Sequence, residues 1–277
     1  MQNVSFFALE LARALLSSGR RFNILFSEKP EWEKRLHAGF RFTRHRITFA
    51  ELSSARLSDY DLIVPLTISD CRFLCTLPAN TLRNFIPVPD MNVLDLCDDK
   101  VRLNSTLLDK GYSRYLPGPA QRGQFPYVLK KSIDTWGQNS HIIKNAQQEQ
   151  HLSKLIDDPD YFCQRYIEGH NEYATHILFI DNQLVCSLNI RNYFTGKLYI
   201  KGKDRPAWKD ITHRQDLKLF TEILKTISYN GLCCINYKVV NGQPVIFEIN
   251  PRFGGSLSLF FFSFLRHLTS EQNSNAV

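Results

Sequence analysis

The chain has 277 residues, enough for one large or two medium domains. With 43% apolar and 22% charged residues, its composition is that of a globular protein and excludes a largely disordered chain. Lysine and arginine exceed aspartate and glutamate by 34 − 27 = +7, a balance that suits an anionic ligand and also permits nucleic acid.

Several sequence features bear on the compartment of the protein. The seven cysteines show neither a CxxC pair nor a zinc-ligand spacing, so we interpret them as core residues in a reducing compartment. The N-terminus lacks the basic and apolar regions of a signal peptide, and the apolar run over residues 257–265 is too short to span a bilayer. We therefore expect a cytoplasmic protein without a membrane segment, in which residues 257–265 form a buried C-terminal helix.

Helix and strand patterns alternate along residues 1–90. Residues 6–17 have the pattern of an amphipathic helix. Strands are predicted over residues 22–26, 46–49 and 60–66. This alternation is typical of a parallel sheet with crossover helices, so we expect a small Rossmann-like domain. The segment has no G-x-G-x-x-G motif, and dinucleotide binding is therefore not supported.

A helix, a strand and a polar loop are predicted next. The helix covers residues 98–110, with an aspartate near its start and a glycine just after its end. The strand covers residues 127–131, and on it Lys130 and Lys131 point to opposite faces, so only one of them can face a site. Residues 132–141 form a loop with a single glycine, whose backbone amides could still hold a phosphate.

A strand-rich segment follows. A strand over residues 161–167 is broken by Glu168-Gly169, and an antiparallel meander comes after it. The meander strands are predicted over residues 172–180, 184–192 and 197–200, with a turn at Asp181-Asn182. One edge of the meander is basic and polar, and solvation is the default role for each of its members. We assign only Arg191 of this edge to a site, where it would line the acceptor region or touch a phosphate.

A helix and a hairpin complete the pattern. The helix covers residues 212–229, with Thr212 or Asp210 as its cap and Gly231 at its end. Two apolar, β-rich runs then flank Asn241-Gly242, which is the strongest short-range signal of a β-hairpin. These runs are residues 233–240 and 244–249.

The second hairpin strand ends in the motif E-x-N-P-R-x-G-G-S. Side chains alternate along a strand, so Glu248 and Asn250 point to the same face, and Asn236 lies opposite them on the first strand. Carboxylate and amide oxygens are ligands that Mg²⁺ prefers. Arg252 follows at once, and a guanidinium beside a metal suits the charge that develops on a transferred phosphoryl group. An isolated E-x-N would indicate only a solvated strand end, but the hairpin context favours a site.

The motif and its hairpin resemble the ATP-grasp superfamily, most closely the branch with carbamoyl-phosphate synthetase and biotin carboxylase. The resemblance covers roughly residues 90–260 and, weakly, the preceding segment. It implies an α/β protein with an ATP-grasp fold, α+β in its catalytic part. Residues 1–90 would be a shortened Rossmann-like pre-grasp domain and residues 91–277 the ATP-grasp domain. The small subdomain would cover about residues 115–165 and the large one about 166–277.

The resemblance implies ATP as cosubstrate and assigns residues to it in the family's sequence order. Lys100 and Lys130 would contact the phosphates, and Glu172 would bind the ribose hydroxyls. Backbone groups of a hinge would recognise the adenine edge. The hinge residues would be Arg165, Tyr166 and Ile167.

The resemblance also implies a metal site and catalytic residues. Asn236, Glu248 and Asn250 would hold the Mg²⁺ or Mn²⁺ of ATP. Arg252 and Lys130 would stabilise the transition state of phosphoryl transfer. Two departures from the family stand out: Asn236 is a neutral amide where relatives carry Asp, Glu or Gln, and the phosphate loop has one glycine where most relatives have several.

The predicted function is an ATP- and Mg²⁺-dependent ligase that activates a small-molecule carboxylate as an acyl-phosphate, which an amine, a thiol or another nucleophile then attacks. Three alternatives stay open. The first is another ATP-grasp reaction, such as kinase-like phosphotransfer or a carbamoyl-phosphate-type step. The second is a non-catalytic nucleotide-binding protein, which the neutral Asn236 favours. The third is nucleic-acid binding, which rests on net charge alone and which we disfavour. No membrane partner is expected, and a homodimer stays open.

Overall fold

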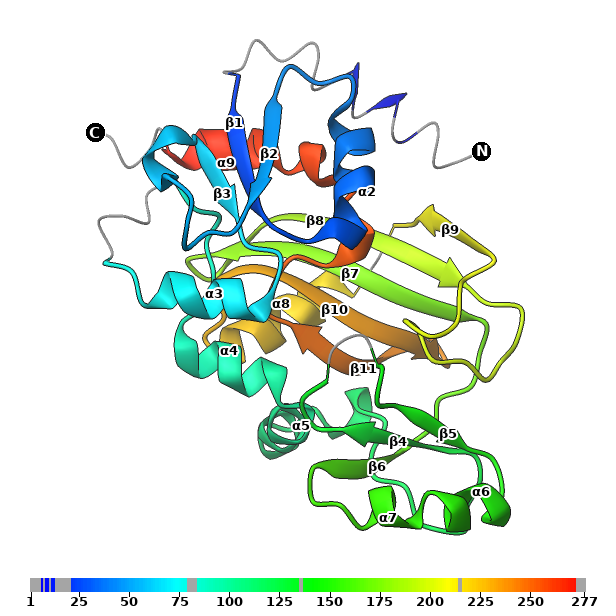
Figure 1. Cartoon of the computed structure of the whole chain (residues 1–277). Coiled ribbons are helices and arrows are strands. Elements are labelled where there is room, and N and C mark those ends of the chain that lie inside the picture. The colour runs from blue at the N-terminus through cyan, green and yellow to red at the C-terminus, as the bar shows by residue number, and fades with distance from the viewer. Residues whose placement is uncertain are drawn as a thin grey trace.

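The computed structural model describes residues 6, 8–9, 11–12, 21–78, 84–134, 137–213 and 216–272. They form three β-sheets that follow one another down the long axis of the molecule (Figure 1). The helix predicted over residues 6–17 lies largely outside the described residues. Among the helices that are described, none is long and apolar enough to cross a membrane.

The first sheet is parallel, in the order β2-β1-β3. Its strands are β1 (Asn23–Ser27), β2 (Arg46–Ala50) and β3 (Leu62–Val64), and it is flanked by α2 (Pro30–Phe40), η1 (Leu57–Asp59) and α3 (Ile68–Cys75). Strand β3 is fully buried, as expected for an apolar strand of a covered parallel sheet. Thr67 and Asp70 form a capping box that fixes the start of α3. The predicted parallel sheet with crossover helices is confirmed.

Two consecutive helices, α4 (Met91–Asp98) and α5 (Lys100–Asp109), lead from the first sheet to the second. Asp99 separates them because its backbone is extended, and its carboxylate accepts hydrogen bonds from the first amides of α5. The short helix η3 (Ser113–Tyr115) follows. The predicted helix over residues 98–110 is confirmed as α5, whereas α4 is not anticipated by the sequence.

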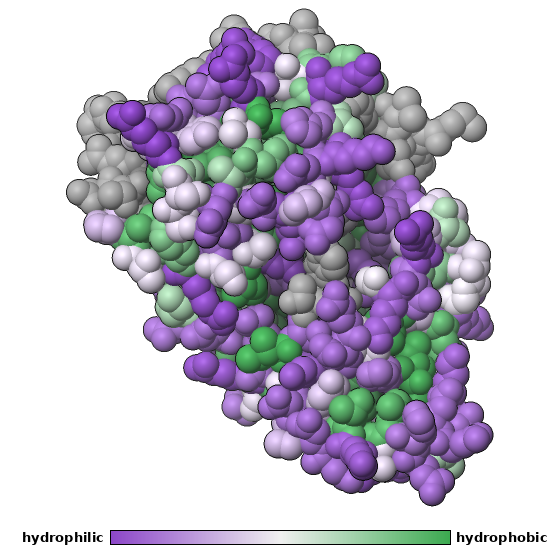
Figure 2. Space-filling view, in the orientation of Figure 1, coloured by the Kyte–Doolittle hydropathy of each residue, from purple (hydrophilic) through white to green (hydrophobic). Residues whose placement is uncertain are grey.

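A small antiparallel sheet has the order β5-β4-β6. It contains β4 (Tyr127–Lys131), β5 (His141–Ile143) and β6 (Tyr161–Arg165), with α6 (Ala146–His151) and α7 (Ser153–Ile156) packed beside it. Figure 2 shows the same side of the molecule, where hydrophilic residues cover most of the surface and an apolar patch lies over this lower sheet.

The largest sheet has five antiparallel strands in the order β11-β10-β7-β8-β9. They are β7 (Asn171–Ile180), β8 (Gln183–Tyr193), β9 (Trp208–Ile211), β10 (Gly231–Val240) and β11 (Gln243–Asn250). The turns at Asp181-Asn182 and Asn241-Gly242 both have positive φ at the two central residues, as two-residue hairpins require. Both predicted turns are therefore confirmed.

The two faces of this sheet pack against different parts of the chain. One face carries Ile177, Phe179 and Ile235 and packs against α4, α5 and α8 (Leu217–Thr226). The other face carries Leu178, Leu188 and Leu232, which share a core with β1, α2 and the C-terminal segment. That segment consists of η4 (Gly255–Leu257), η5 (Phe261–Ser263) and α9 (Leu265–Gln272). The remainder of the second face is polar and forms the floor of the site described below.

Two predicted elements differ from the structure. Residues 197–200 form a loop, and the strand that pairs with β8 is instead β9, eleven residues further on. The helix predicted from residue 212 starts at Leu217 as α8, because Asp210 pairs with Arg191 and Thr212 accepts a hydrogen bond from Asn189. Gly231 opens β10 and does not end that helix.

The predicted helix over residues 257–265 is also wrong, although its burial is right. These residues form short 3₁₀ turns before α9 begins. The Ser258 and Ser263 hydroxyls donate to carbonyls three residues earlier, at 2.9 and 2.8 Å, and such bonds compete with α-helix formation.

Candidate active site

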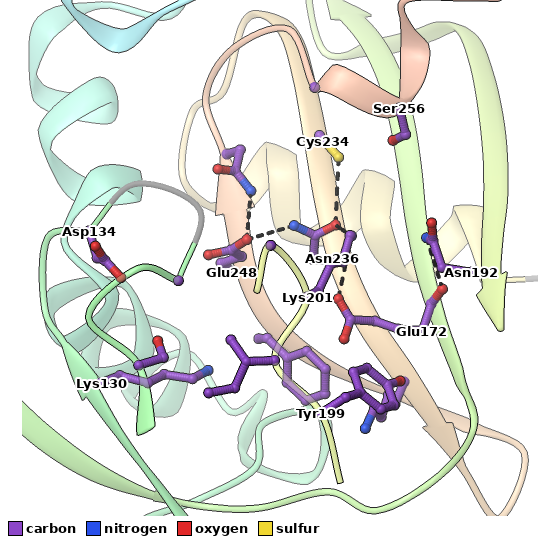
Figure 3. A pocket seen from close by; sticks show the side chains of 18 of the residues that line it. Lys130, Asp134, Glu172, Asn192, Tyr199, Lys201, Cys234, Asn236, Glu248 and Ser256 are labelled. Atoms are coloured by element: carbon purple, nitrogen blue, oxygen red, sulfur yellow. Dashed lines mark hydrogen bonds and ion pairs between the residues drawn. The ribbon is translucent and has the colours of Figure 1, made fainter. Parts of the chain in front are cut away.

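A cavity of about 300 Å³ lies on the polar part of the large sheet (Figure 3). The small sheet and α2 contribute to its walls through Lys130, Gln164 and Trp32. Strand alternation explains its floor, because Cys234, Asn236 and Lys238 follow Leu232 on one face of β10 while the residues between them point into the opposite core. Chain segments distant in sequence therefore converge on one pocket.

The β10–β11 hairpin places an amide–carboxylate cluster in this cavity. Asn236 and Glu248 are direct cross-strand partners, which decides between the two partners, Glu248 and Asn250, that the hairpin left open. The side-chain amides of Asn236 and Asn250 donate to the same oxygen, Glu248 Oε1, at 2.6 and 3.0 Å. Glu248 Oε2 accepts no hydrogen bond from the part of the chain that the structure describes. The Asn250 Oδ1 atom accepts from Arg252 Nη2 at 3.2 Å, which ties the guanidinium to the cluster.

Glu248 is held as a carboxylate. Burial would raise its pKa, but the charge of Lys100, the two amide hydrogen bonds and the charge of Lys130 outweigh that effect and lower the pKa to about 2. The carboxylate is therefore ionised at any physiological pH and suited to a hard cation.

Lys100 and Lys130 face the cavity from one side. Lys100 is the first residue of α5, and its ammonium lies 3.4 Å from the carbonyl oxygens of both Ser132 and Asp134 in the predicted phosphate loop. Lys130 donates to Gln164 Oε1 at 2.8 Å. Burial lowers the pKa of Lys130 to about 8. Lys131 points the other way and forms an ion pair with Asp160, as the strand alternation predicts.

The predicted hinge lines the far end of the cavity. Arg165 ends β6, and Tyr166 and Ile167 follow it. The Tyr166 hydroxyl donates to the carbonyl of Tyr199 and accepts from its amide, which fixes the ring in place. Lys238 donates to the Ile167 carbonyl at 2.7 Å and lies over the Tyr199 ring. This end of the cavity combines aromatic surface with backbone polar groups, the composition of a site for a planar base.

Glu172, at the start of β7, is buried and lines the cavity next to the hinge. Its Oε1 atom lies 3.4 Å from the ammonium of Lys201, and Lys201 also donates to Asn236 Oδ1 at 2.6 Å. Lys201 thus links the carboxylate of Glu172 to the amide–carboxylate cluster.

The opposite end of the cavity lies against α2 and the C-terminal turn. Arg252, Arg35 and Lys209 bring positive charge there from three different elements. Burial and the neighbouring charges of Arg35 and Lys201 lower the pKa of Lys209 to about 8. At Gly255 an added Cβ would meet the Trp32 ring at 2.7 Å, so this backbone can approach α2 only without a side chain.

Arg191 is the one predicted site residue that lies away from the cavity. It points across β8 to β9, where its guanidinium makes a two-fold hydrogen bond with Asp210 and lies over the Trp208 ring. The geometry therefore gives it a structural partner and does not support its assignment to the site. The other predicted residues converge on the cavity. They are Lys100, Lys130, Arg165, Tyr166, Ile167, Glu172, Asn236, Glu248, Asn250 and Arg252.

Sequence reasoning did not assign several cavity residues. Lys238 could have been found, because it lies two residues after Asn236 on the same strand face. Trp32 and Arg35 have the helical i, i+3 spacing of one face of α2. Gln164 carries no local signal, since its position depends on the small sheet, and Lys201 belongs to the basic edge of the predicted meander, for whose members solvation was the default expectation.

The fold is shared with solved ligases and carboxylases. D-alanine–D-alanine ligase from Bacillus anthracis superposes with a TM-score of 0.56 at 13% identity, covering 92% of this chain and 100% of that one. The L-amino acid ligase from Bacillus licheniformis superposes with a TM-score of 0.55 at 13% identity, covering 89% of this chain and 71% of that one. Biotin carboxylase from Campylobacter jejuni, in its β-γ-ATP complex, superposes with a TM-score of 0.53 at 14% identity, covering 93% of this chain and 65% of that one. At such identities the likeness establishes the fold alone.

The family follows from the sequence. The model of the ATP-grasp domain matches residues 97–256, more than half of the chain, so the protein belongs to the ATP-grasp family. The resemblance based on the hairpin motif is thereby confirmed. A search of curated protein sequences gives no match.

Proposed function

We propose that this protein is an ATP- and Mg²⁺-dependent ligase that activates a carboxylate as an acyl-phosphate for attack by an amine or another nucleophile. One observation carries the proposal: Glu248, Asn250 and Arg252 lie in the same cavity as Lys100 and Lys130. Oxygen ligands for a cation and fixed positive charges for phosphate are the parts that phosphoryl transfer needs.

The nucleotide would lie across the cavity from the hinge to the hairpin. Its base would contact the backbone at Arg165 to Ile167, and Glu172 would accept hydrogen bonds from the ribose hydroxyls. Lys100 and Lys130 would contact the phosphates. Similarity to a biotin carboxylase solved as a β-γ-ATP complex supports ATP as the nucleotide.

The donor set fits a divalent cation. Glu248 is ionised and its Oε2 accepts no hydrogen bond from the described residues, while Asn250 Oδ1 accepts one, so both retain lone pairs for a metal. Mg²⁺ or Mn²⁺ bound there would neutralise charge on the phosphates of ATP. One carboxylate and neutral amides are a weak cage, so we expect the ion to arrive with the nucleotide.

The proposed reaction has two steps. First, a carboxylate oxygen bonds to the γ-phosphorus as the bond to the β,γ-bridging oxygen breaks and ADP leaves. Second, the nucleophile bonds to the carbonyl carbon, the bond from that carbon to the phosphate oxygen breaks, phosphate leaves, and the nucleophile loses a proton to solvent. Arg252 and Lys130 would stabilise the charge on the transferred group in the first step.

No protein nucleophile is required. Burial raises the pKa of Cys71 and Cys97 to about 12, and burial raises that of Cys234, the one cysteine among the cavity residues, to about 11. These thiols stay protonated near neutral pH and are poor nucleophiles.

The carboxylate substrate would occupy the end of the cavity next to α2. Arg35, Lys209 and Arg252 supply the positive charge that a carboxylate needs there. We also propose a cytoplasmic location, which the free thiols support, and the division into a pre-grasp part before about residue 90 and an ATP-grasp part after it.

The proposal is tested by incubating the protein with ATP, Mg²⁺ and panels of amino acids and small carboxylates, and by measuring ADP release. Hydroxylamine added in place of the nucleophile should trap the acyl-phosphate as a hydroxamate. ADP release that depends on a carboxylate, together with a hydroxamate, supports the ligase. A stable phosphorylated product without hydroxamate would indicate kinase-like transfer, and nucleotide binding without ADP release would indicate a binding protein.

A further inference from the structure

We propose that the nucleotide site takes a single divalent ion, and that the ammonium of Lys201 supplies the positive charge that a second ion would otherwise bring. This inference rests on the proposed function, because it concerns the charge balance around the bound triphosphate. It is carried by the contacts of Asn236, Lys201 and Glu172.

Asn236 is used as a connector and is not free to act as a ligand. Its Nδ2 donates to Glu248 Oε1 at 2.6 Å, and its Oδ1 accepts from Lys201 Nζ at 2.6 Å. The thiol of Cys234 also points at Oδ1, at 3.8 Å. A carbonyl oxygen has two lone-pair sites, so a metal ion could bind Oδ1 only by displacing one of these donors. The oxygens that keep lone pairs for a cation are therefore Glu248 Oε2 and Asn250 Oδ1, the latter with one hydrogen bond from Arg252.

Lys201 is held where it is by its own loop. The amide of Ile200 donates to the Asp204 carboxylate at 2.7 Å, and Lys201 pairs with Asp204 in a short β-bridge. Lys203, two residues on, donates to the Ser140 carbonyl at 2.7 Å. The Lys201 side chain lines the cavity, where its ammonium contacts both Asn236 and Glu172. The loop thus presents a fixed cation to the cluster.

Electrostatics favours this cation over a second metal ion. Glu172 lies 3.4 Å from Lys201, so this carboxylate already has a cation beside it and is not an unengaged ligand for a second ion. Glu248 is then the carboxylate left for a divalent ion among the residues of the cluster. A second divalent ion next to Asn236 would be repelled by Lys201 at close range and would gain only a neutral amide. A carboxylate at position 236 would attract a second ion, and loss of the lysine at 201 would remove the repulsion.

The test counts metal ions per bound nucleotide by equilibrium dialysis with Mn²⁺ and the non-hydrolysable analogue AMP-PNP, with radioactive nucleotide and atomic absorption as the readouts. We expect one Mn²⁺ per bound nucleotide in the wild-type protein. The double variant Asn236→Asp/Lys201→Met adds a carboxylate and removes the ammonium, and it should bind two. Lys203→Met is the matched control, because it removes a lysine of the same loop that donates to Ser140, and it should keep one.

Thermal unfolding monitored by circular dichroism verifies that each variant is folded. Two Mn²⁺ ions per nucleotide in the wild type would overturn the inference, and so would one ion in a folded double variant. If Lys203→Met also bound a second ion, the total charge of the loop, and not Lys201 in particular, would decide the number of Mn²⁺ ions per nucleotide, and the inference would be wrong. Failure of the wild type to bind any nucleotide would refute the proposed function itself, and this inference with it.

Discussion

Replacement of Lys130 by alanine tests whether β4 presents one lysine to the nucleotide. Lys130 faces the cavity, whereas Lys131, its neighbour on the same strand, pairs with Asp160 on the other side. A hydrogen bond to a charged group contributes about 1.5–3 kcal/mol, and a factor of ten in affinity corresponds to about 1.4 kcal/mol. Lys130→Ala should therefore weaken ATP binding by about 10- to 150-fold.

The matched control is Lys131→Ala. Its ion pair with Asp160 spans 3.4 Å and is partly exposed, and such pairs contribute little, so ATP affinity should change less than about twofold. Isothermal titration calorimetry with ATP and Mg²⁺ measures both variants, and thermal unfolding checks that they are folded. Equal losses in the two variants, or a larger loss in Lys131→Ala, would show that the strand faces are assigned wrongly.

The lowered pKa of Lys130 adds a pH dependence to the same experiment. Burial lowers this pKa to about 8, and only the protonated ammonium attracts phosphate. ATP affinity should therefore be highest below pH 8 and fall as the pH rises above it, with proton uptake on binding. Titrations in buffers of different ionisation enthalpy measure that uptake. The uptake should be smaller in Lys130→Met, and an unchanged uptake would assign it to another group.

Three further predictions concern the metal, the base and the packing of α2. Glu248→Gln should abolish turnover and weaken Mn²⁺ binding in the presence of ATP while the melting temperature stays close to that of the wild type; an unchanged metal titration would remove the hairpin as the metal site. Arg165→Ala should keep the preference for ATP over GTP if the hinge recognises the base through its backbone, as we propose, and a competition assay that finds the preference lost would assign it to the side chain. Gly255→Ala should lower the free energy of unfolding by about 1–3 kcal/mol in urea, because its Cβ would meet Trp32 at 2.7 Å, whereas Gly196→Ala, whose nearest contact is 3.7 Å, should be neutral.

Local signals predicted much of the geometry of the cavity. Alternation along a strand was enough to place Glu248 and Asn250 on one face and to separate Lys130 from Lys131. The turn at Asn241-Gly242 fixed the register of the strand ends next to it, from Val240–Gln243 to Tyr237–Ile246, whereas a β-bulge next to Tyr237 shifts Asn236 to its partner Glu248. These inferences succeeded because each depends on residues that are close in sequence.

The expectations that differ from the structure depend on contacts between distant segments. Arg191 has the chemistry of a phosphate ligand, but the sequence does not show that Asp210 lies opposite it on β9. The helix start was misplaced for the same reason, since Asp210 is engaged by that arginine and does not cap α8. Lys201 lies in the loop between β8 and β9, where it forms an isolated bridge with Asp204, so no helix or strand periodicity could bring its ammonium to Asn236.

Part of the positive charge of the chain is concentrated in the cavity. Several cations surround two buried or partly buried carboxylates, Glu172 and Glu248. These cations include Lys100, Lys130, Lys201, Lys238 and Arg252. Burial lowers the pKa of Lys130 and Lys238 to about 8, which means that the ligand-free cavity holds positive charge at a cost. A bound triphosphate removes that cost, because its oxygens replace the hydration that the ammonium groups have lost. Since these fixed cations already offset part of the charge of a triphosphate, the complex needs fewer mobile ions than the phosphates alone would require.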